Sequence, residues 1–272
     1  MHGVGISHGA ISVMNAIPCG VGATIGIDLK TEAVFDSADD VKIELIDREG
    51  MSTLLAETCV KRTRERIGAD VNDGYHLTVR TDIPPSMGLK SSSSVCNAII
   101  SAVLNAYGKE IDELDMIRIG TQCARECKVT ITGAFDDACG CHLGGLVITK
   151  NSNDELLYSD EVPEYDVVIC VPDRMIPKDK VPVDRYIERM AEYAFMSSIV
   201  KRDYTFVLTE NGKHVAQIIG DDNILADKAM KNGAIAAGIT GTGPATAILA
   251  KKGDGERIAK AMGCRTIITR TR

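Results

Sequence analysis

Residues 41–46 and 77–82 place apolar and polar side chains at alternating positions. In the first segment Val41, Ile43 and Leu45 occupy every second position, and the second segment repeats the pattern. A period of two indicates a strand with one buried face. The pattern therefore predicts two half-buried strands in the first half of the chain.

Helical spacing follows the second of these segments. Val95, Ile99 and Val103 lie on one face of a predicted helix over residues 92–107, which Gly108 ends. A further helix is predicted to open at Asp112 and to continue to about Lys128.

A domain boundary is predicted near the middle of the chain. Gly144-Gly145 leads into an apolar strand over 146–148, and the polar segment 151–160 is predicted to be a connection. We therefore expect two domains, residues 1–155 and 156–272. The further elements predicted for the second half are strands over 167–171, 235–240, 245–250 and 266–269 and helices over 184–202, 223–231 and 256–262.

Composition restricts the class of protein. The chain has 272 residues, of which 44% are apolar and 25% charged, as in ordinary globular proteins. Its net charge of −7 has the wrong sign for a surface that neutralises phosphate backbones, and 4% aromatic residues without Trp give few platforms for stacking bases. We expect no nucleic-acid partner.

Two stretches without charged side chains, residues 3–27 and 233–250, are candidates for membrane segments. Gly, Ser, Thr and Pro interrupt both, so neither predicts a membrane span. Instead, their glycines are predicted to let the backbone approach a ligand closely. Nine cysteines, an odd number in a chain of this size, favour a reducing compartment, and we expect the cytoplasm.

The most informative motif lies between a predicted strand and a predicted helix. It reads Pro84-Pro85-Ser86-Met87-Gly88-Leu89-Lys90-Ser91-Ser92-Ser93-Ser94. Unpaired amides at a helix N-terminus, together with several hydroxyls, favour an anion site. The alternative is a serine-rich N-cap that only completes its own helix.

Carboxylates form a second group of candidates. Asp136 and Asp137 are adjacent, so on a strand or turn only one of them is expected to face a given site. One of these acids, with Glu126 and a hydroxyl from Ser91 to Ser93, offers the oxygen ligands that Mg²⁺ prefers. Taken singly, each acid is better explained by a surface or capping role.

A third motif, Thr240-Gly241-Thr242-Gly243-Pro244, lies between two predicted strands. Its amides form a candidate nest for an oxyanion, and a plain hairpin turn is the alternative. A different class of protein would follow if Cys123, Cys127, Cys139, Cys141 and His142 bound zinc, but their spacing is poor for a zinc site.

These three motifs, in this order, resemble the GHMP superfamily of small-molecule kinases, named for galactokinase, homoserine, mevalonate and phosphomevalonate kinases. The central family motif is Pro-x3-Gly-Leu-Gly-Ser-Ser-Ala-Ala. This chain follows it from Pro84, with Lys90 in place of the third-position glycine and serines in place of the alanines. The resemblance covers most of the chain.

The spacing of acids in the family selects one pair here. The family places an acid seven residues before a Gly and a metal-binding Glu about eleven residues earlier. Counting from Gly144 gives Asp137 and then Glu126. The family's N-terminal Asn matches Asn15, whereas the catalytic Lys that some members carry near the N-terminus has no counterpart, since the first basic residue is Lys30.

Within the superfamily, residues 9–30 and 132–138 are similar to the archaeal type of shikimate kinase. The resemblance implies transfer of a phosphoryl group from ATP to shikimate, with a homoserine kinase or another GHMP kinase as the nearest alternative. A non-catalytic nucleotide-binding protein or a zinc-stapled protein is the alternative from another class.

The resemblance also implies a fold and a set of roles. The fold is α+β, with an N-terminal domain like domain 2 of ribosomal protein S5 and a ferredoxin-like C-terminal domain. ATP and Mg²⁺ are the implied cofactors, Asp137 the implied base, and Ser92 and Glu126 the implied metal ligands. The implied nucleotide-binding residues are Pro85, Ser86, Met87, Gly88, Leu89, Lys90, Ser91, Ser92, Ser93 and Ser94. The implied substrate or phosphate loop comprises Asn15, Thr240, Gly241, Thr242 and Gly243.

Overall fold

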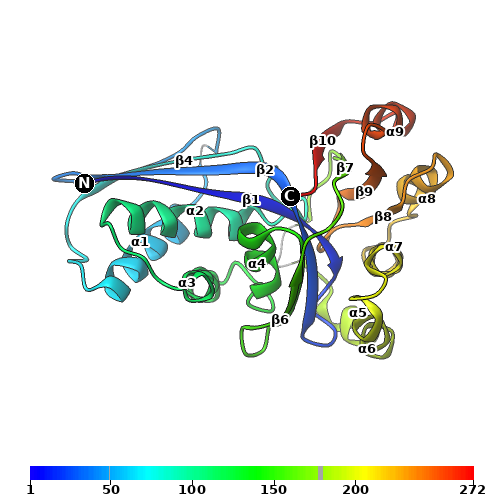
Figure 1. Cartoon of the computed structure of the whole chain (residues 1–272), viewed down its shortest axis with the longest axis horizontal. Coiled ribbons are helices and arrows are strands. Elements are labelled where there is room, and N and C mark those ends of the chain that lie inside the picture. The colour runs from blue at the N-terminus through cyan, green and yellow to red at the C-terminus, as the bar shows by residue number, and fades with distance from the viewer. Residues whose placement is uncertain (49, 177–179) are drawn as a thin grey trace.

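The computed structural model describes residues 1–48, 50–176 and 180–272, which form two α+β units (Figure 1). The first unit is built on a sheet in which the strands follow the order β3-β4-β2-β5-β6, with β1 paired to β2. Its strands are β1 (His2–Met14), β2 (Val21–Ser37), β3 (Val41–Leu45), β4 (Tyr75–Thr81), β5 (Leu146–Lys150) and β6 (Glu155–Asp160). Its helices are α1 (Leu54–Ile67), α2 (Ser91–Ala106), α3 (Glu113–Glu126) and α4 (Phe135–Leu143).

The uncharged stretch 3–27 forms most of a long antiparallel hairpin between β1 and β2. Sequence reasoning predicted that its glycines admit a ligand, and this is wrong for the first strand. A Cβ at Gly3 would lie 2.2 Å from the Ala102 carbonyl oxygen and one at Gly5 2.0 Å from the Ala98 oxygen. These glycines therefore let helix α2 pack directly on the β1 backbone.

Helices α1 to α4 lie on one side of the first sheet (Figure 1). Their core contains Phe35 from β2 together with Ile99 and Val103 from α2, all fully buried. The predicted helices over 92–107 and 112–128 are confirmed as α2 and α3, and Asp112 caps α3 by accepting the Leu114 and Asp115 amides. The apolar faces predicted from spacing are the faces that this core buries.

Two predictions in the first half are corrected. The segment 151–160 is not only a connection, because β6 pairs with β5 and extends the first sheet to Asp160. The two adjacent acids lie on helix α4 rather than on a strand or turn. Helix α1 was not predicted.

The second unit contains a four-stranded antiparallel sheet in the order β10-β7-β9-β8. Its strands are β7 (Tyr165–Cys170), β8 (Ala236–Ile239), β9 (Thr246–Lys251) and β10 (Thr266–Arg270). Its helices are α5 (Val183–Ile187), α6 (Met190–Ile199), α7 (Tyr204–Ile219), α8 (Ile224–Lys231) and α9 (Gly255–Met262). In this order the two later strands, β9 and β10, alternate with the two earlier strands, β7 and β8. The same alternation is found in ferredoxin-like domains.

The single helix predicted over 184–202 is wrong, because α5 and α6 are separate around Glu188 and Arg189. Helix α7, which was not predicted, packs on β8 so closely that a Cβ at Gly212 would lie 2.2 Å from the Gly238 Cα. The two sheets are joined at the C-terminus, where Thr271 bridges to Ile27 of β2.

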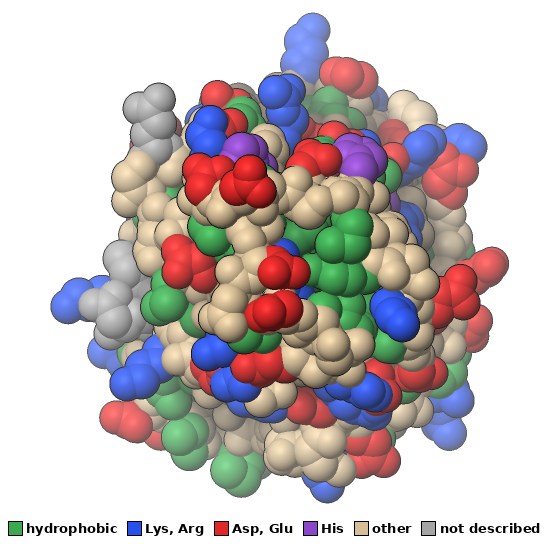
Figure 2. Space-filling view, turned by 90° about the vertical axis from the view of Figure 1, so that its left-hand side faces the viewer, with side chains coloured by type: hydrophobic (Ala, Val, Ile, Leu, Met, Phe, Trp, Pro, Cys, Tyr) green, Lys and Arg blue, Asp and Glu red, His purple; other side chains and the backbone are tan. Residues whose placement is uncertain are grey.

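The surface carries both signs of charge. In the view onto the end of the molecule that holds the N-terminus, acidic and basic side chains are interspersed (Figure 2). Within the described residues, no helix has the length and apolar character needed to cross a membrane.

Candidate active site

In the loop before helix α2, the sign of the backbone φ angle alternates from residue to residue. Ser86, Gly88 and Lys90 have positive φ values of 58°, 74° and 66°, whereas Met87 and Leu89 between them do not. Alternating signs of φ turn successive backbone N–H groups toward one side, which forms an anion-binding nest. Helix α2 continues from this nest with its own unpaired N-terminal amides.

The glycine-rich tip between β8 and β9 contacts this loop. A Cβ at Gly88 would lie 2.0 Å from the Thr240 carbonyl oxygen, and one at Gly241 would lie 2.9 Å from the Gly88 Cα. The Thr240 hydroxyl donates to the Gly88 oxygen at 3.1 Å and accepts the Ser12 amide at 2.9 Å. The two predicted phosphate loops are therefore packed against one another across the two domains.

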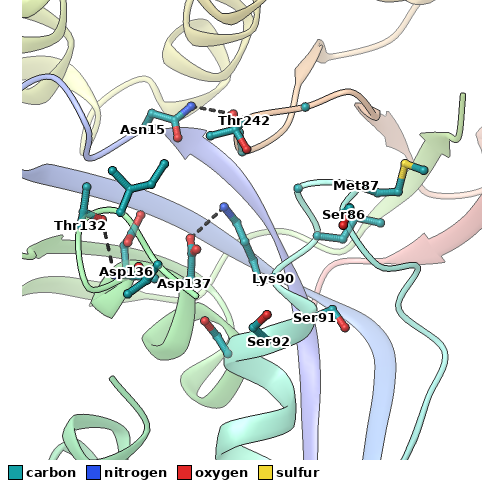
Figure 3. A pocket seen from close by; sticks show the side chains of 18 of the residues that line it. Asn15, Ser86, Met87, Lys90, Ser91, Ser92, Thr132, Asp136, Asp137 and Thr242 are labelled. Carbon is teal, nitrogen blue, oxygen red and sulfur yellow. Dashed lines mark hydrogen bonds and ion pairs between the residues drawn. The ribbon is translucent and has the colours of Figure 1, made fainter. Parts of the chain in front are cut away.

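Lys90 occupies the left-handed position at which the family motif has glycine. Its backbone adopts φ 66° and ψ 28°, so the lysine keeps the conformation that a glycine would take. Its side chain turns inward: Nζ lies 2.8 Å from Asp137 Oδ1 and donates to Ser12 Oγ at 2.7 Å. Figure 3 shows the Lys90 and Asp137 side chains directed toward one another.

Helix α4 brings both acids to the cavity. Gly133 and Ala134 have positive φ values of 91° and 54° and turn the chain into the first turn of the helix. Asp136 is buried there, and Asp137 is about one fifth exposed. Because both residues lie in one helical turn, both line the cavity. The expectation that only one of the two acids would face the site assumed a strand or turn, and it is wrong.

Asp136 is held by a residue that sequence reasoning missed. Asn151, which directly follows β5, donates its side-chain amide to Asp136 Oδ1 at 2.7 Å and accepts the Asp136 backbone N–H at 3.1 Å. Burial and the charge of Asp137 raise the pKa of Asp136 to about 7, against the lowering effects of Lys90 and Asn151. The sequence did offer one indication of this role, because Asn151 directly follows an apolar strand and begins a polar segment.

These residues surround a cavity of about 150 Å³ between the two domains. The sequence-predicted residues that line it are Asn15, Ser86, Met87, Gly88, Leu89, Lys90, Ser91, Ser92, Ser93, Asp137, Gly241, Thr242 and Gly243. Asn15 is fixed by donating to the Gly241 oxygen at 2.7 Å. The serine cluster and the selected acid are thus brought together in one place.

Four predicted residues do not line this cavity: Pro85, Ser94, Thr240 and Glu126. Ser94 is fully buried and donates to Thr31 Oγ1 at 2.8 Å, so it anchors α2 to the sheet. Thr240 bridges Ser12 and Gly88 beneath the loops, as described above. Pro85 lines a neighbouring cavity.

The structure does not bring Glu126 into the central cavity. Its carboxylate accepts two hydrogen bonds from Arg62, both at 3.0 Å, and one from Gln122 at 3.1 Å. About one third of each side chain in the pair with Arg62 is exposed, at 33% for Glu126 and 36% for Arg62. Solvent screens such an exposed pair, so it contributes little to stability.

A second, smaller cavity of about 90 Å³ adjoins the first, and Ser91 and Ser92 line both. Its walls are mostly apolar and include Leu45, Leu55 and Val95. This space suits a flat, weakly polar group attached to the anion held at the α2 N-terminus.

The cysteines considered for zinc remain apart. Cys123, Cys139 and Cys141 are buried and Cys127 donates to Thr58 Oγ1 at 3.3 Å. In residues 1–48, 50–176 and 180–272, no group of three or more His, Cys, Asp or Glu side chains could hold a metal.

Two domain families match this chain. The GHMP kinases N terminal domain matches residues 54–145, and the GHMP kinases C terminal domain matches residues 208–268. The chain belongs to the GHMP kinase family, as the resemblance of its three motifs predicted.

Its relatives within the family include shikimate kinases. The chain is 36% identical to the shikimate kinase of Methanothrix thermoacetophila over 96% of this chain and 90% of that protein. It is 35% identical to the shikimate kinase of Halobacterium salinarum over 90% of this chain and 87% of that protein.

Solved structures share the fold. The Methanococcus jannaschii mevalonate kinase superposes with a TM-score of 0.81 at 16% identity, covering 100% of this chain and 99% of that one. The homoserine kinase from Cytophaga hutchinsonii gives a TM-score of 0.76 at 15% identity, covering 100% and 94%. The predicted two-domain α+β fold is thereby confirmed.

Proposed function

We propose that this protein transfers the γ-phosphoryl group of ATP to a hydroxyl of shikimate, giving 3-phosphoshikimate for chorismate and aromatic amino acid biosynthesis. The observation that carries the proposal is that Asp137 and the serines at the start of α2 line one cavity. The shikimate kinases at 35–36% identity support the choice of substrate.

The nucleotide is assigned to the two adjoining cavities. The nest formed by Ser86 to Lys90 and the N-terminal amides of α2 would bind the phosphates. The apolar cavity lined by Leu45, Leu55 and Val95 would hold the adenine base. Ser91 and Ser92 line both cavities and so lie between base and phosphates.

Asp137 is proposed to receive the proton of the attacking hydroxyl. As the hydroxyl oxygen forms its bond to the γ-phosphorus, the bond from the γ-phosphorus to the bridging oxygen breaks and ADP leaves. The protein mainly positions the two reactants and neutralises charge, because phosphoryl transfer requires little covalent work from it. The glycine-rich tip, with Gly241 to Gly243, forms the opposite wall of the cavity.

Magnesium fits this site as an ion held largely by nucleotide oxygens. Mg²⁺ prefers oxygen ligands and keeps several waters and substrate phosphates. Ser92 offers a hydroxyl in the cavity. Glu126, which lies outside the cavity, is proposed as the second protein ligand and would have to leave its exposed pair with Arg62 to reach the ion. Bound there, the ion would neutralise charge that develops between the β- and γ-phosphates.

The test is to measure ADP release with a coupled assay. Shikimate, homoserine and mevalonate are supplied as acceptors in separate reactions. Turnover with shikimate alone supports the proposal. Turnover with homoserine alone would assign the alternative kinase activity, and nucleotide binding without turnover of any acceptor would place the protein in the non-catalytic class.

A further inference from the structure

Lys90 combines two unfavourable features in one residue. Its backbone is held at a positive φ of 66°, a conformation that is strained for any residue with a Cβ. Its ammonium group is also removed from water, since the side chain is only 5% exposed. A residue that retains both costs at the edge of a cavity indicates a functional constraint.

The Lys90–Asp137 ion pair differs from the others in the chain. Among the ion pairs of the described residues, the next least exposed Lys or Arg has 36% of its side chain exposed. A buried pair contributes little net stability, because desolvation offsets the attraction between the charges. The pair therefore is poorly explained as a device that stabilises the fold.

The contacts of Lys90 connect three elements that form the cavity. Its backbone begins helix α2, its Nζ contacts Asp137 of α4 at 2.8 Å, and the same Nζ donates to Ser12 of β1 at 2.7 Å. Among the described residues that line the cavity, it is the one Lys or Arg. Figure 3 shows its side chain reaching from the start of α2 toward α4.

The surrounding charges keep the ammonium group protonated. Burial alone would lower the pKa of Lys90, but the charges of Asp137 and Asp136 outweigh it, and the net shift of the pKa is upward. The buried Cys141 thiol donates weakly to the Lys90 backbone oxygen at 3.8 Å. Lys90 is therefore available as a cationic hydrogen-bond donor to the carboxylate.

We propose that Lys90 is the positioning residue of the reaction: its ammonium group fixes the Asp137 carboxylate relative to the phosphate-binding loop that its own backbone forms. One residue then sets the distance between the bound phosphates and the carboxylate that receives the proton. This inference rests on the proposed function of Asp137 in phosphoryl transfer.

Lys90→Gly is the decisive variant. Glycine adopts φ 66° without strain, so the loop and the binding of ATP are expected to persist. We expect kcat to fall on the order of 10²-fold, as for loss of proton-transfer catalysis, while KM for ATP changes less than about twofold. Butylammonium, which has the four carbons and the ammonium group of the missing side chain, should restore part of the rate in a saturable manner.

The matched control is Lys30→Met. Lys30 also forms an ion pair, with Glu32 at 2.7 Å, but its side chain is 43% exposed and does not line the cavity. This variant should keep the wild-type kcat and KM. Lys90→Met is measured beside Lys90→Gly, with thermal unfolding of both, so that a loss of fold is recognised.

Opposite results would overturn the inference. If Lys90→Gly has the wild-type kcat, the ammonium group does not position Asp137. If kcat is retained and KM for ATP rises, Lys90 serves nucleotide binding alone. All variants are compared with the wild type on whichever acceptor the wild type phosphorylates. If shikimate is not the substrate, the wild type itself fails to phosphorylate it. The ratio of the variant kcat to the wild-type kcat can then still be measured on the other acceptor.

Discussion

The Asn151 side chain makes two hydrogen bonds to Asp136, one to its carboxylate at 2.7 Å and one to its backbone N–H at 3.1 Å. Asn151 follows β5, and Asp136 lies in the first turn of α4, so the pair fixes the start of α4 on the sheet. The remaining side-chain contacts of Asn151, with Thr149 and Thr132, are at 2.7 and 3.1 Å.

Asn151→Ala should weaken this connection. Loss of a buried hydrogen-bonding group leaves partners unsatisfied, and we expect the free energy of unfolding to fall by about 1–3 kcal/mol. Urea denaturation measures this change. Asn153→Ala is the control, since Asn153 is exposed and, among the described residues, its side-chain amide contacts only the exposed Ser152 and Glu155. Equal stability of the two variants would contradict the anchoring role of Asn151.

The pKa of Asp136 predicts a pH dependence of stability. Its pKa of about 7 in the folded protein lies above the ordinary value of 3.8, so the folded state keeps a proton that the unfolded state has released. Stability attributable to this group therefore falls as the pH rises from about 4 to 7, and is constant above that range.

Asp136→Asn mimics the neutral carboxyl group and removes this dependence. The free energy of unfolding of the variant, relative to the wild type, should increase with pH by up to about 1.4 kcal/mol per unit within this range. Denaturation at pH 5, 6 and 7 measures the difference, in which the other titrating groups cancel. A difference that does not change with pH would show that Asp136 is ionised throughout.

The contact between the two glycine-rich loops predicts the effect of Gly88→Ala. Its methyl group would lie 2.0 Å from the Thr240 oxygen, so the loops must separate. We expect KM for ATP to rise about tenfold or more, equivalent to roughly 1.4 kcal/mol. Gly108→Ala is the control: its φ is also positive, at 58°, but nothing lies within 4 Å of the added Cβ. It should lose stability without any change in KM.

The proposed role of Glu126 as a magnesium ligand predicts opposite effects for two variants. If Glu126 exchanges Arg62 for Mg²⁺, Glu126→Gln should raise the Mg²⁺ concentration needed for half-maximal rate several-fold. Arg62→Ala should lower it, because the exchange is no longer opposed. Magnesium titrations at fixed ATP measure both, and unchanged midpoints in both variants would remove Glu126 from the metal site.

Regular spacing made much of the fold accessible from sequence. Val95, Ile99 and Val103 identified helix α2, and a capping Asp112 identified the start of α3. Helix α1 has equally regular buried positions, at Ala56, Cys59 and Val60, but its many charged residues hid the pattern. Helix α4 has only nine residues, one of them Gly and two of them Cys, so its periodicity was too weak to recognise.

Site residues were accessible where a motif fixed their spacing. Counting from Gly144 selected Asp137, which lies in the cavity, and the serine motif selected the start of α2. The same counting could not show that Arg62, 64 positions away from Glu126, would bind that acid. Nor could it show that the Lys90 side chain would turn back from the loop to Asp137, because this contact depends on the packing of α4 against β2.

Asp137→Asn tests the central claim most directly. The change keeps the shape of the side chain and removes its capacity to accept the hydroxyl proton. With shikimate as acceptor, kcat should fall by roughly 10²-fold or more, while the Kd for ATP, measured separately by calorimetry, changes little. A variant with near-normal kcat, or an inactive Asp136→Asn beside an active Asp137→Asn, would contradict the assignment of Asp137 as the group that receives the proton.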